Sequence, residues 1–217
     1  MLRCVKITFF YQPIFNTPLL HHLISCTEAF MATDHANIDF SAFGIEVTFY
    51  QEKETLDSKT LKLGVACEAP DWLSAAAQLC ISSIPPMPAL EQLVINGDRG
   101  QLWQDDIGAP QWLELLHPFA SVKYLVLSKK SVKFVTPALE DLTGGGVIEL
   151  LPMLQHLFLD LEEPWLAGAV RREIKEFIAA RQLFGCPVTV YVAGLGPITD
   201  GDLLFDECEL FGNSFNS

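Results

Sequence analysis

A short motif of the form apolar-x-x-Leu-x-apolar recurs at a fixed interval, and it restricts the fold more than any other feature of the chain. The same interval leads back from the motif to Leu61 and Leu63, and Val188–Val192 lies near the position of a further copy. A fixed period of this size is typical of stacked supersecondary units whose neighbours share one elongated core. The copies begin, each 32 residues after the one before, at Leu90 (LEQLVI), Val122 (VKYLVL) and Leu154 (LQHLFL).

Helical patterns separate these apolar motifs. Apolar residues recur with the spacing of one helix face in residues 112–119, 170–178 and 72–80. Each motif itself is short and Leu-rich, as expected for a buried strand. The alternation predicts an α/β fold: a leucine-rich-repeat-like solenoid of strand–helix units with a period of about 32 and a mostly parallel sheet.

One segment departs from the repeat. Ile45–Phe49 alternates apolar and polar residues and is joined by a charged connection to Thr60–Val65, so these two segments are predicted to form an antiparallel hairpin near 45–65. The periodicity ends after residue 193. We therefore expect a single α/β domain over residues 1–193 and an acidic, weakly ordered tail over 194–217.

Six segments of the chain, in order, resemble the C-terminal, leucine-rich-repeat-like region of the F-box-like proteins of mushroom-forming fungi. They are TPLLHHLISCTEAF, ANIDFSAFGIEVTF, PPMPALEQLVI, QWLELLHPFASVKYLVLS, PALEDL with ELLPMLQHLFL, and IKEFIAARQLFGCPVTV, and they cover most of residues 10–192. In that family the F-box binds a ubiquitin-ligase adaptor, and the repeat region is presumed to recognise substrates. No Leu-Pro-x-Glu-type F-box opening stands at the start of this chain. The resemblance therefore implies recognition of a protein partner or ubiquitin-ligase substrate, without adaptor binding.

The composition narrows the choice of partner and compartment. The formal net charge is −13, which disfavours a protein that binds the nucleic-acid backbone. The chain contains no run of 18 apolar residues, so no membrane span is expected. Six cysteines among 217 residues are too few for a disulfide framework and indicate an intracellular protein, cytoplasmic or nuclear. These thiols are expected to be buried as small apolar groups.

No catalytic, metal-binding or cofactor-binding motif stands out. The cysteines contain no C-x-x-C pair, and His21-His22 lacks the spacing of a metal site. Gly144–Gly146 is not followed by the Lys-Ser/Thr pair that a phosphate-binding loop needs. Asp200-x-Asp202 lacks the glycine and the closing glutamate of a calcium loop. The carboxylates of Asp160, Glu162 and Glu163 precede Pro164 and are expected in an exposed loop. We therefore predict a protein that is not an enzyme and that needs no cofactor.

The strand pattern also predicts a partner-binding face. In each motif the leucines face the helices, so the alternating residues face the other way, on the concave surface of a solenoid. This face is unusually apolar, which favours a partner, although parallel sheets are often covered on both sides. If this face is covered, a missing N-terminal domain or the tail around residues 203–205 would cover it. The predicted partner-binding residues are Lys62, Gln92, Val94, Asn96, Tyr124, Val126, Ser128, His156, Phe158 and Asp160.

Two alternatives to a non-catalytic protein-interaction scaffold remain at this point. One is a small hydrolase whose non-local triad uses His117 or His156. The other is a truncated gene product without an independent function.

Overall fold

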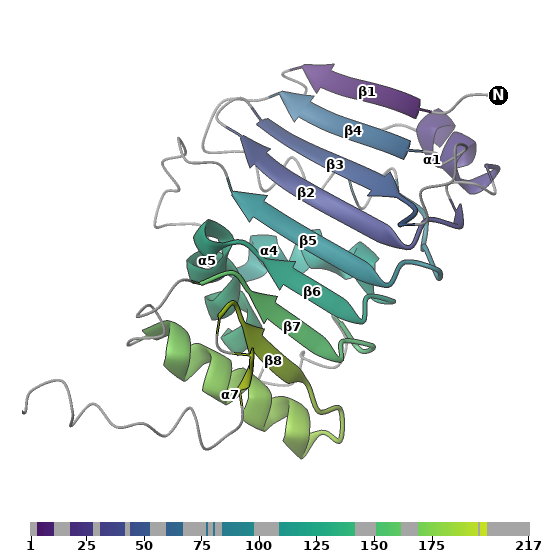
Figure 1. The fold of residues 1–217 in the computed structure, drawn as a ribbon. Coiled ribbons are helices and arrows are strands. Elements are labelled where there is room, and N and C mark those ends of the chain that lie inside the picture. The colour runs from purple at the N-terminus through teal and green to yellow at the C-terminus, as the bar shows by residue number, and fades with distance from the viewer. Residues whose placement is uncertain are drawn as a thin grey trace, which may run out of the picture.

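One mixed sheet organises the molecule (Figure 1). The structure is a computed structural model, which describes residues 4–10, 18–27, 31–41, 44–52, 60–66, 77, 80, 84–97, 109–141, 151–161, 169–194 and 196–198. The nine described strands lie in the order β1-β4-β3-β2-β5-β6-β7-β8-β9. Their bounds are β1 (Cys4–Phe10), β2 (His35–Ser41), β3 (Gly44–Tyr50), β4 (Thr60–Ala66), β5 (Gln92–Gly97), β6 (Tyr124–Leu127), β7 (His156–Leu159), β8 (Thr189–Val192) and β9 (Gly196–Ile198).

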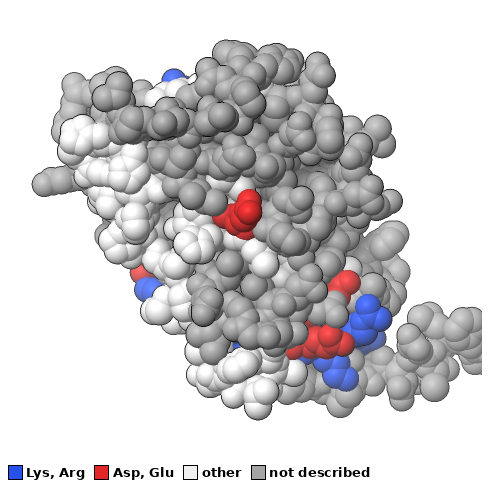
Figure 2. Space-filling model, turned by 180° about the vertical axis from the view of Figure 1, so that it is seen from behind, with Lys and Arg blue, Asp and Glu red and all other residues white. Residues whose placement is uncertain are grey.

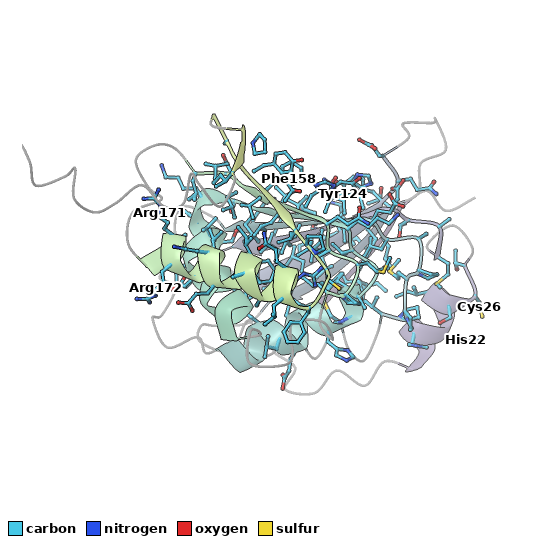
Figure 3. The ribbon with its side chains drawn as sticks, turned by 90° about the horizontal axis from the view of Figure 1, so that it is seen from below. His22, Cys26, Tyr124, Phe158, Arg171 and Arg172 are labelled. Atoms are coloured by element: carbon cyan, nitrogen blue, oxygen red, sulfur yellow. The ribbon has the colours of Figure 1, made fainter. Side chains whose placement is uncertain are left out.

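Helices α4, α5 and α7 lie behind the sheet in Figure 1, and α1 lies beside the end of β1 and β4. No described helix lies in front of the sheet (Figures 1 and 3). The described helical segments are α1 (Pro18–Ser25), α4 (Ala109–Leu116), the 3-10 turn η1 (His117–Phe119), α5 (Lys129–Asp141) and α7 (Ala169–Leu183).

The three motif strands pair in parallel and in register. Leu93 of β5 lies opposite Leu125 of β6, which lies opposite Leu157 of β7. All three leucines are completely buried. The prediction that these leucines line up on neighbouring parallel strands is confirmed, and β8 continues the parallel series.

The predicted hairpin is confirmed, but its place in the sheet is not the expected one. β3 and β4 pair antiparallel, with Val47 opposite Leu63. The repeat places the strand of Leu61 and Leu63 beside β5, whereas the parallel neighbour of β5 is β2, with Ile38 opposite Ile95. This expectation was wrong because β2 and β3 form a hairpin of their own, closed by the Ser41–Gly44 pair. The two strands of this hairpin lie between β4 and β5 in the sheet.

The parallel sheet extends less far than the repeat suggests. Besides β3 and β4, the pairs β2–β3 and β8–β9 are antiparallel. β9 spans Gly196–Ile198, within residues 194–217, which were expected to form an acidic, weakly ordered tail. Residues 199–217 lie outside the described part of the chain. The architecture is therefore a mixed α/β fold with one sheet. The consecutive strands β2, β5, β6, β7 and β8 of this sheet are all parallel.

The helices bury the faces that their spacing predicts. Trp112, Leu115, Leu116 and Phe119 are fully buried, with the Trp112 ring against Phe40 of β2 at a centroid distance of 5.7 Å. On α7, Ile174, Phe177 and Ile178 are buried. α7 ends before Gly185, whose φ of +72° is the left-handed conformation that closes many helices. Of the helix predicted over residues 72–80, only Ala77 and Cys80 are described, and both are buried.

Candidate partner-binding face of the sheet

The side of the sheet opposite α4, α5 and α7 is called the helix-free face here. Its residues alternate along each strand with those that pack on the helices. The predicted site residues within the strands lie on this face, and the register places one row of it across the sheet. That row consists of Lys62, Thr48, Asn37, Val94, Val126, Phe158 and Tyr191.

Four rings form a continuous group on β6, β7 and β8, called the ring cluster. Tyr124 stacks on His156 with centroids 5.0 Å apart and planes 8° apart. Phe158 stacks on Tyr191 at 4.6 Å and 10°. His156 joins the two stacks, with its centroid 5.8 Å from that of Tyr191. Figure 3 shows Tyr124 and Phe158 on the side of the sheet away from α7.

The ring cluster is half-buried rather than enclosed. Tyr124, His156, Phe158 and Tyr191 all keep partial exposure, and so do Val94 and Val126 beside them. By contrast, the helix-facing residues of the same strands, such as Leu125 and Leu157, are fully buried. The described elements therefore cover one side of the sheet and leave an apolar, ring-rich surface on the other.

An acidic group lies on the helix-free face of β2 and β5. Asn37 and Asn96 each donate a side-chain N–H to Asp39, to Oδ2 at 2.8 Å and to Oδ1 at 3.0 Å, respectively. The Asn96 amide also donates to Asn37 Oδ1 at 3.0 Å. These neutral donors hold the Asp39 carboxylate in one orientation without cancelling its charge.

Lys62 belongs to a separate charged group at the β1–β4–β3 end. Its Nζ donates to Glu46 Oε1 at 3.0 Å, and Lys6 Nζ lies 2.8 Å from Oε2 of the same carboxylate. The hydrogen bond from Lys6, together with that from Lys62, lowers the pKa of Glu46 despite partial burial. Lys62 therefore lies on the predicted face and in the predicted row, but strands β3 and β2 separate it from Val94.

His35 and Tyr50 stack at the other end of β2 and β3, with centroids 5.3 Å apart. The His35 Nδ1 atom lies 2.8 Å from Asp34 Oδ1, and the backbone N–H of Glu52 donates to the same oxygen at 3.1 Å. Burial raises the pKa of Asp34, but these hydrogen bonds outweigh it and leave that pKa lowered. Burial, followed by the nearby carboxylates, raises the pKa of Tyr50.

The remaining predicted residues differ in their surroundings. Gln92 lies in register with Tyr124 and is half-buried. Asp160 follows β7 and is exposed. The Ser128 hydroxyl accepts the Gly97 N–H at 3.1 Å and lies 3.2 Å from Ser131 Oγ at the start of α5, so it holds the connection between β6 and α5.

Sequence reasoning did not include Asn37, Asp39, Thr48 and Tyr191, which also lie on this face. The alternation Thr189-Val190-Tyr191-Val192 carries the signal for Tyr191, because its outward position follows from the same rule as that of Phe158. No local signal could have placed Asn37 and Asp39 beside Asn96, since that proximity depends on the β2–β5 pairing.

The histidines and cysteines of the sequence analysis are scattered. His117 is exposed in η1, whereas His156 lies in the ring cluster. Among the described residues, neither ring hydrogen-bonds to a hydroxyl, a thiol or a carboxylate, and no three His, Cys, Asp or Glu side chains gather as a metal site requires. Cys80 is buried as predicted, whereas Cys26 is exposed at the end of α1, with its Sγ 3.6 Å from His22 Nδ1, so the prediction of burial was wrong there.

Cys26 is exposed because the helix turns only one face towards the core. Ile24 is fully buried, while His21, His22 and Ser25 are exposed together with Cys26. Cysteine is small enough to be accepted on either face. The glycines at 144–146, the carboxylates at 162 and 163, and Asp200-x-Asp202 lie outside the described residues.

The opposite side of the molecule differs in character. Figure 2, seen from behind, shows acidic and basic side chains mixed at the end where α7 lies. Figure 3 shows Arg171 and Arg172 at the start of that helix, whereas Tyr124 and Phe158 lie on the opposite side of the sheet. The two sides therefore present different chemistry, with mixed charge on the helices and rings on the sheet.

Comparison with known proteins finds no counterpart: no family model, no curated protein and no solved structure matches the chain. Within the described residues, no helix is both long enough and apolar enough to cross a membrane.

Proposed function

We propose that this protein is a non-catalytic protein-interaction scaffold that binds its partner through the helix-free face. The observation that carries the proposal is the ring cluster, four side chains that remain half-exposed on strands whose helix-facing residues, such as Leu125, Leu157 and Val190, are fully buried. Exposed apolar patches of this kind mark interaction sites, and tyrosine is enriched among residues that dominate binding energy.

The repeat and the family resemblance also support this proposal. The in-register leucines of β5, β6 and β7 support a leucine-rich-repeat-like α/β solenoid with a period of about 32 residues. The resemblance to the recognition region of F-box-like fungal proteins suggests a ubiquitin-ligase substrate as the partner, in the cytoplasm or nucleus. In this proposal the chain needs no cofactor and carries out no reaction.

Site-specific photo-crosslinking tests where the partner sits. A photoreactive amino acid replaces Val126 on the helix-free face or, as a control, the exposed Lys175 on α7. We expect a partner that crosslinks from position 126 and not from 175. Equal crosslinking from both positions, or a crosslink from 126 to residues 199–217 of the same chain, would contradict the proposal.

The purified partner then tests the ring cluster directly. Tyr124→Ala combined with Phe158→Ala should weaken binding by about a hundredfold, as loss of two central aromatic contacts does. Leu183→Ala combined with Phe184→Ala is the matched control, because it removes two exposed large apolar side chains, 82% and 44% exposed, from the end of α7. Binding that survives the first pair of substitutions, with folding intact, would show that the partner uses another surface.

A further inference from the structure

Charge is distributed unevenly over the helix-free face. Its lysines, Lys6 and Lys62, are both on the outer strands β1 and β4, where each pairs with Glu46. From β2 through β5 to β8, by contrast, the described residues of this face include no Lys or Arg. The same region carries the carboxylates of Asp39 on β2 and of Asp160, which follows Phe158 of the ring cluster by two residues.

The two carboxylates lie towards the same end of the parallel strands, one on β2 and one directly after β7. Asp39 is in register with Asn96 at the carboxyl end of β5, and Asp160 directly follows β7, two residues after Phe158. Because β2, β5 and β7 run in the same direction, both carboxylates lie at the carboxyl ends of their strands. Asp160 therefore lies beside the ring cluster, whereas Asp39 lies on β2, which β5 separates from the ring-bearing strand β6.

Neither carboxylate is neutralised by a cation within the described part of the chain. Asp39 accepts only the neutral amide donors of Asn37 and Asn96. Asp160 is exposed, and its contact with a neighbouring strand is the backbone N–H that it donates to Leu127 at 2.9 Å. Rings are also favourable partners for cations, because the face of an aromatic ring is electronegative.

We infer that the helix-free face recognises a basic, apolar segment of a partner protein. In this mode an aromatic or aliphatic side chain packs on the ring cluster, and an Arg or Lys of the same segment pairs with Asp160 beside the rings or with Asp39 two strands further along the sheet. Arginine suits both surfaces best, since its planar guanidinium binds carboxylates in two-point fashion and stacks on rings. The overall charge of −13 would attract such a segment from a distance. This inference rests on the proposed function and adds the chemistry of the partner.

A display library of short random peptides, selected on the intact chain, tests this inference. We expect the selected peptides to combine an Arg or Lys with an aromatic or Leu residue. Their affinity should fall about tenfold for Asp39→Asn combined with Asp160→Asn, and fall with rising salt. The matched control is Glu114→Gln combined with Glu176→Gln, because it removes the same two charges from exposed positions on α4 and α7. Equal losses in both variants would mean non-specific attraction and would overturn the inference.

A peptide variant keeps the test decisive if the aspartate variant does not fold. Replacing the peptide arginine by citrulline removes its charge and keeps its shape, so binding to the unaltered protein should weaken by about tenfold. Selected peptides that contain no cation, or that bind equally well with citrulline, would overturn the inference. If these peptides still lose binding to the Tyr124→Ala, Phe158→Ala variant, the proposed function would stand. If the peptides bind the Tyr124→Ala, Phe158→Ala variant unchanged, both the proposed function and the inference of a basic, apolar partner segment would fail.

Discussion

Arg181 illustrates how a single buried charge can hold two elements together. Its side chain is on α7 and only 1% exposed. Nη1 donates to the Leu151 carbonyl at 3.1 Å and Nη2 to the Leu154 carbonyl at 2.6 Å. Burial lowers the pKa of the guanidinium. These bonds fix the turn from which β7 begins, and so they indirectly position His156 and Phe158.

Replacing Arg181 should therefore be costly. Arg181→Met keeps much of the apolar stem and removes the charged donors of two buried carbonyls, of which that of Leu151 still accepts the Leu154 N–H at 3.1 Å, so the free energy of unfolding should fall by about 3 kcal/mol. Arg181→Lys should cost less, because the ammonium group can reach one of the two carbonyls. Urea denaturation followed by circular dichroism measures both. A Met variant as stable as the unaltered protein would contradict this role for the guanidinium.

His156 presents the opposite case, a polar atom that lacks a partner. Its Nδ1 is enclosed and has no hydrogen bond among the described residues, while the ring stacks on Tyr124. His156→Phe preserves the stack and removes the unpaired nitrogen. We expect the free energy of unfolding to rise by about 1 kcal/mol in chemical denaturation. A loss of stability of similar size would show that Nδ1 is satisfied in solution.

At the scale of elements, α5 and α7 are joined by a buried polar contact. Thr136 Oγ1 donates to Glu173 Oε2 at 2.7 Å, and the two residues are 1% and 8% exposed. A carboxylate in such a place depends on its few donors, because its charge is largely removed from water. The contact therefore specifies how these two helices meet.

Thr136→Val tests this contact with almost no change of shape. The variant leaves the Glu173 carboxylate without the hydroxyl, so the free energy of unfolding should fall by about 2 kcal/mol. Adding Glu173→Met should recover most of the loss, since both polar partners are then absent and the interface becomes apolar. Thermal denaturation of the two variants provides the comparison. A double variant less stable than Thr136→Val alone would mean that Glu173 has partners beyond Thr136.

At the scale of the whole molecule, two cysteines report on different levels of unfolding. Cys26 is exposed, whereas Cys80 lies within the core, where burial raises the pKa of its thiol to about 12. Iodoacetamide reacts with thiolates, so it should label Cys26 in the native protein and Cys80 only as the core opens. Peptide mapping by mass spectrometry distinguishes the two sites. Native labelling of Cys80 as fast as that of Cys26 would mean that the core opens readily.

The sequence pattern predicted the helix-facing residues of the motif strands and the outward direction of Tyr124, Val126, His156 and Phe158. These predictions succeeded because side chains alternate along a strand whatever its neighbours are. The buried faces of α4 and α7 were predictable for the same kind of reason, since helical periodicity is also a local property.

The sequence by itself thus determined which residues of each element face inwards and which face outwards. Only the tertiary structure decided which strands are neighbours: β2, rather than β4, lies beside β5, and this pairing brings Asn37 and Asp39 to Asn96. The physical reason is that strand pairing uses backbone hydrogen bonds, which are the same for nearly every residue, so local patterns carry little information about the partner. The hairpins of β2, β3 and β4 settled the strand order, and with it the polar neighbours of the Asp39 carboxylate.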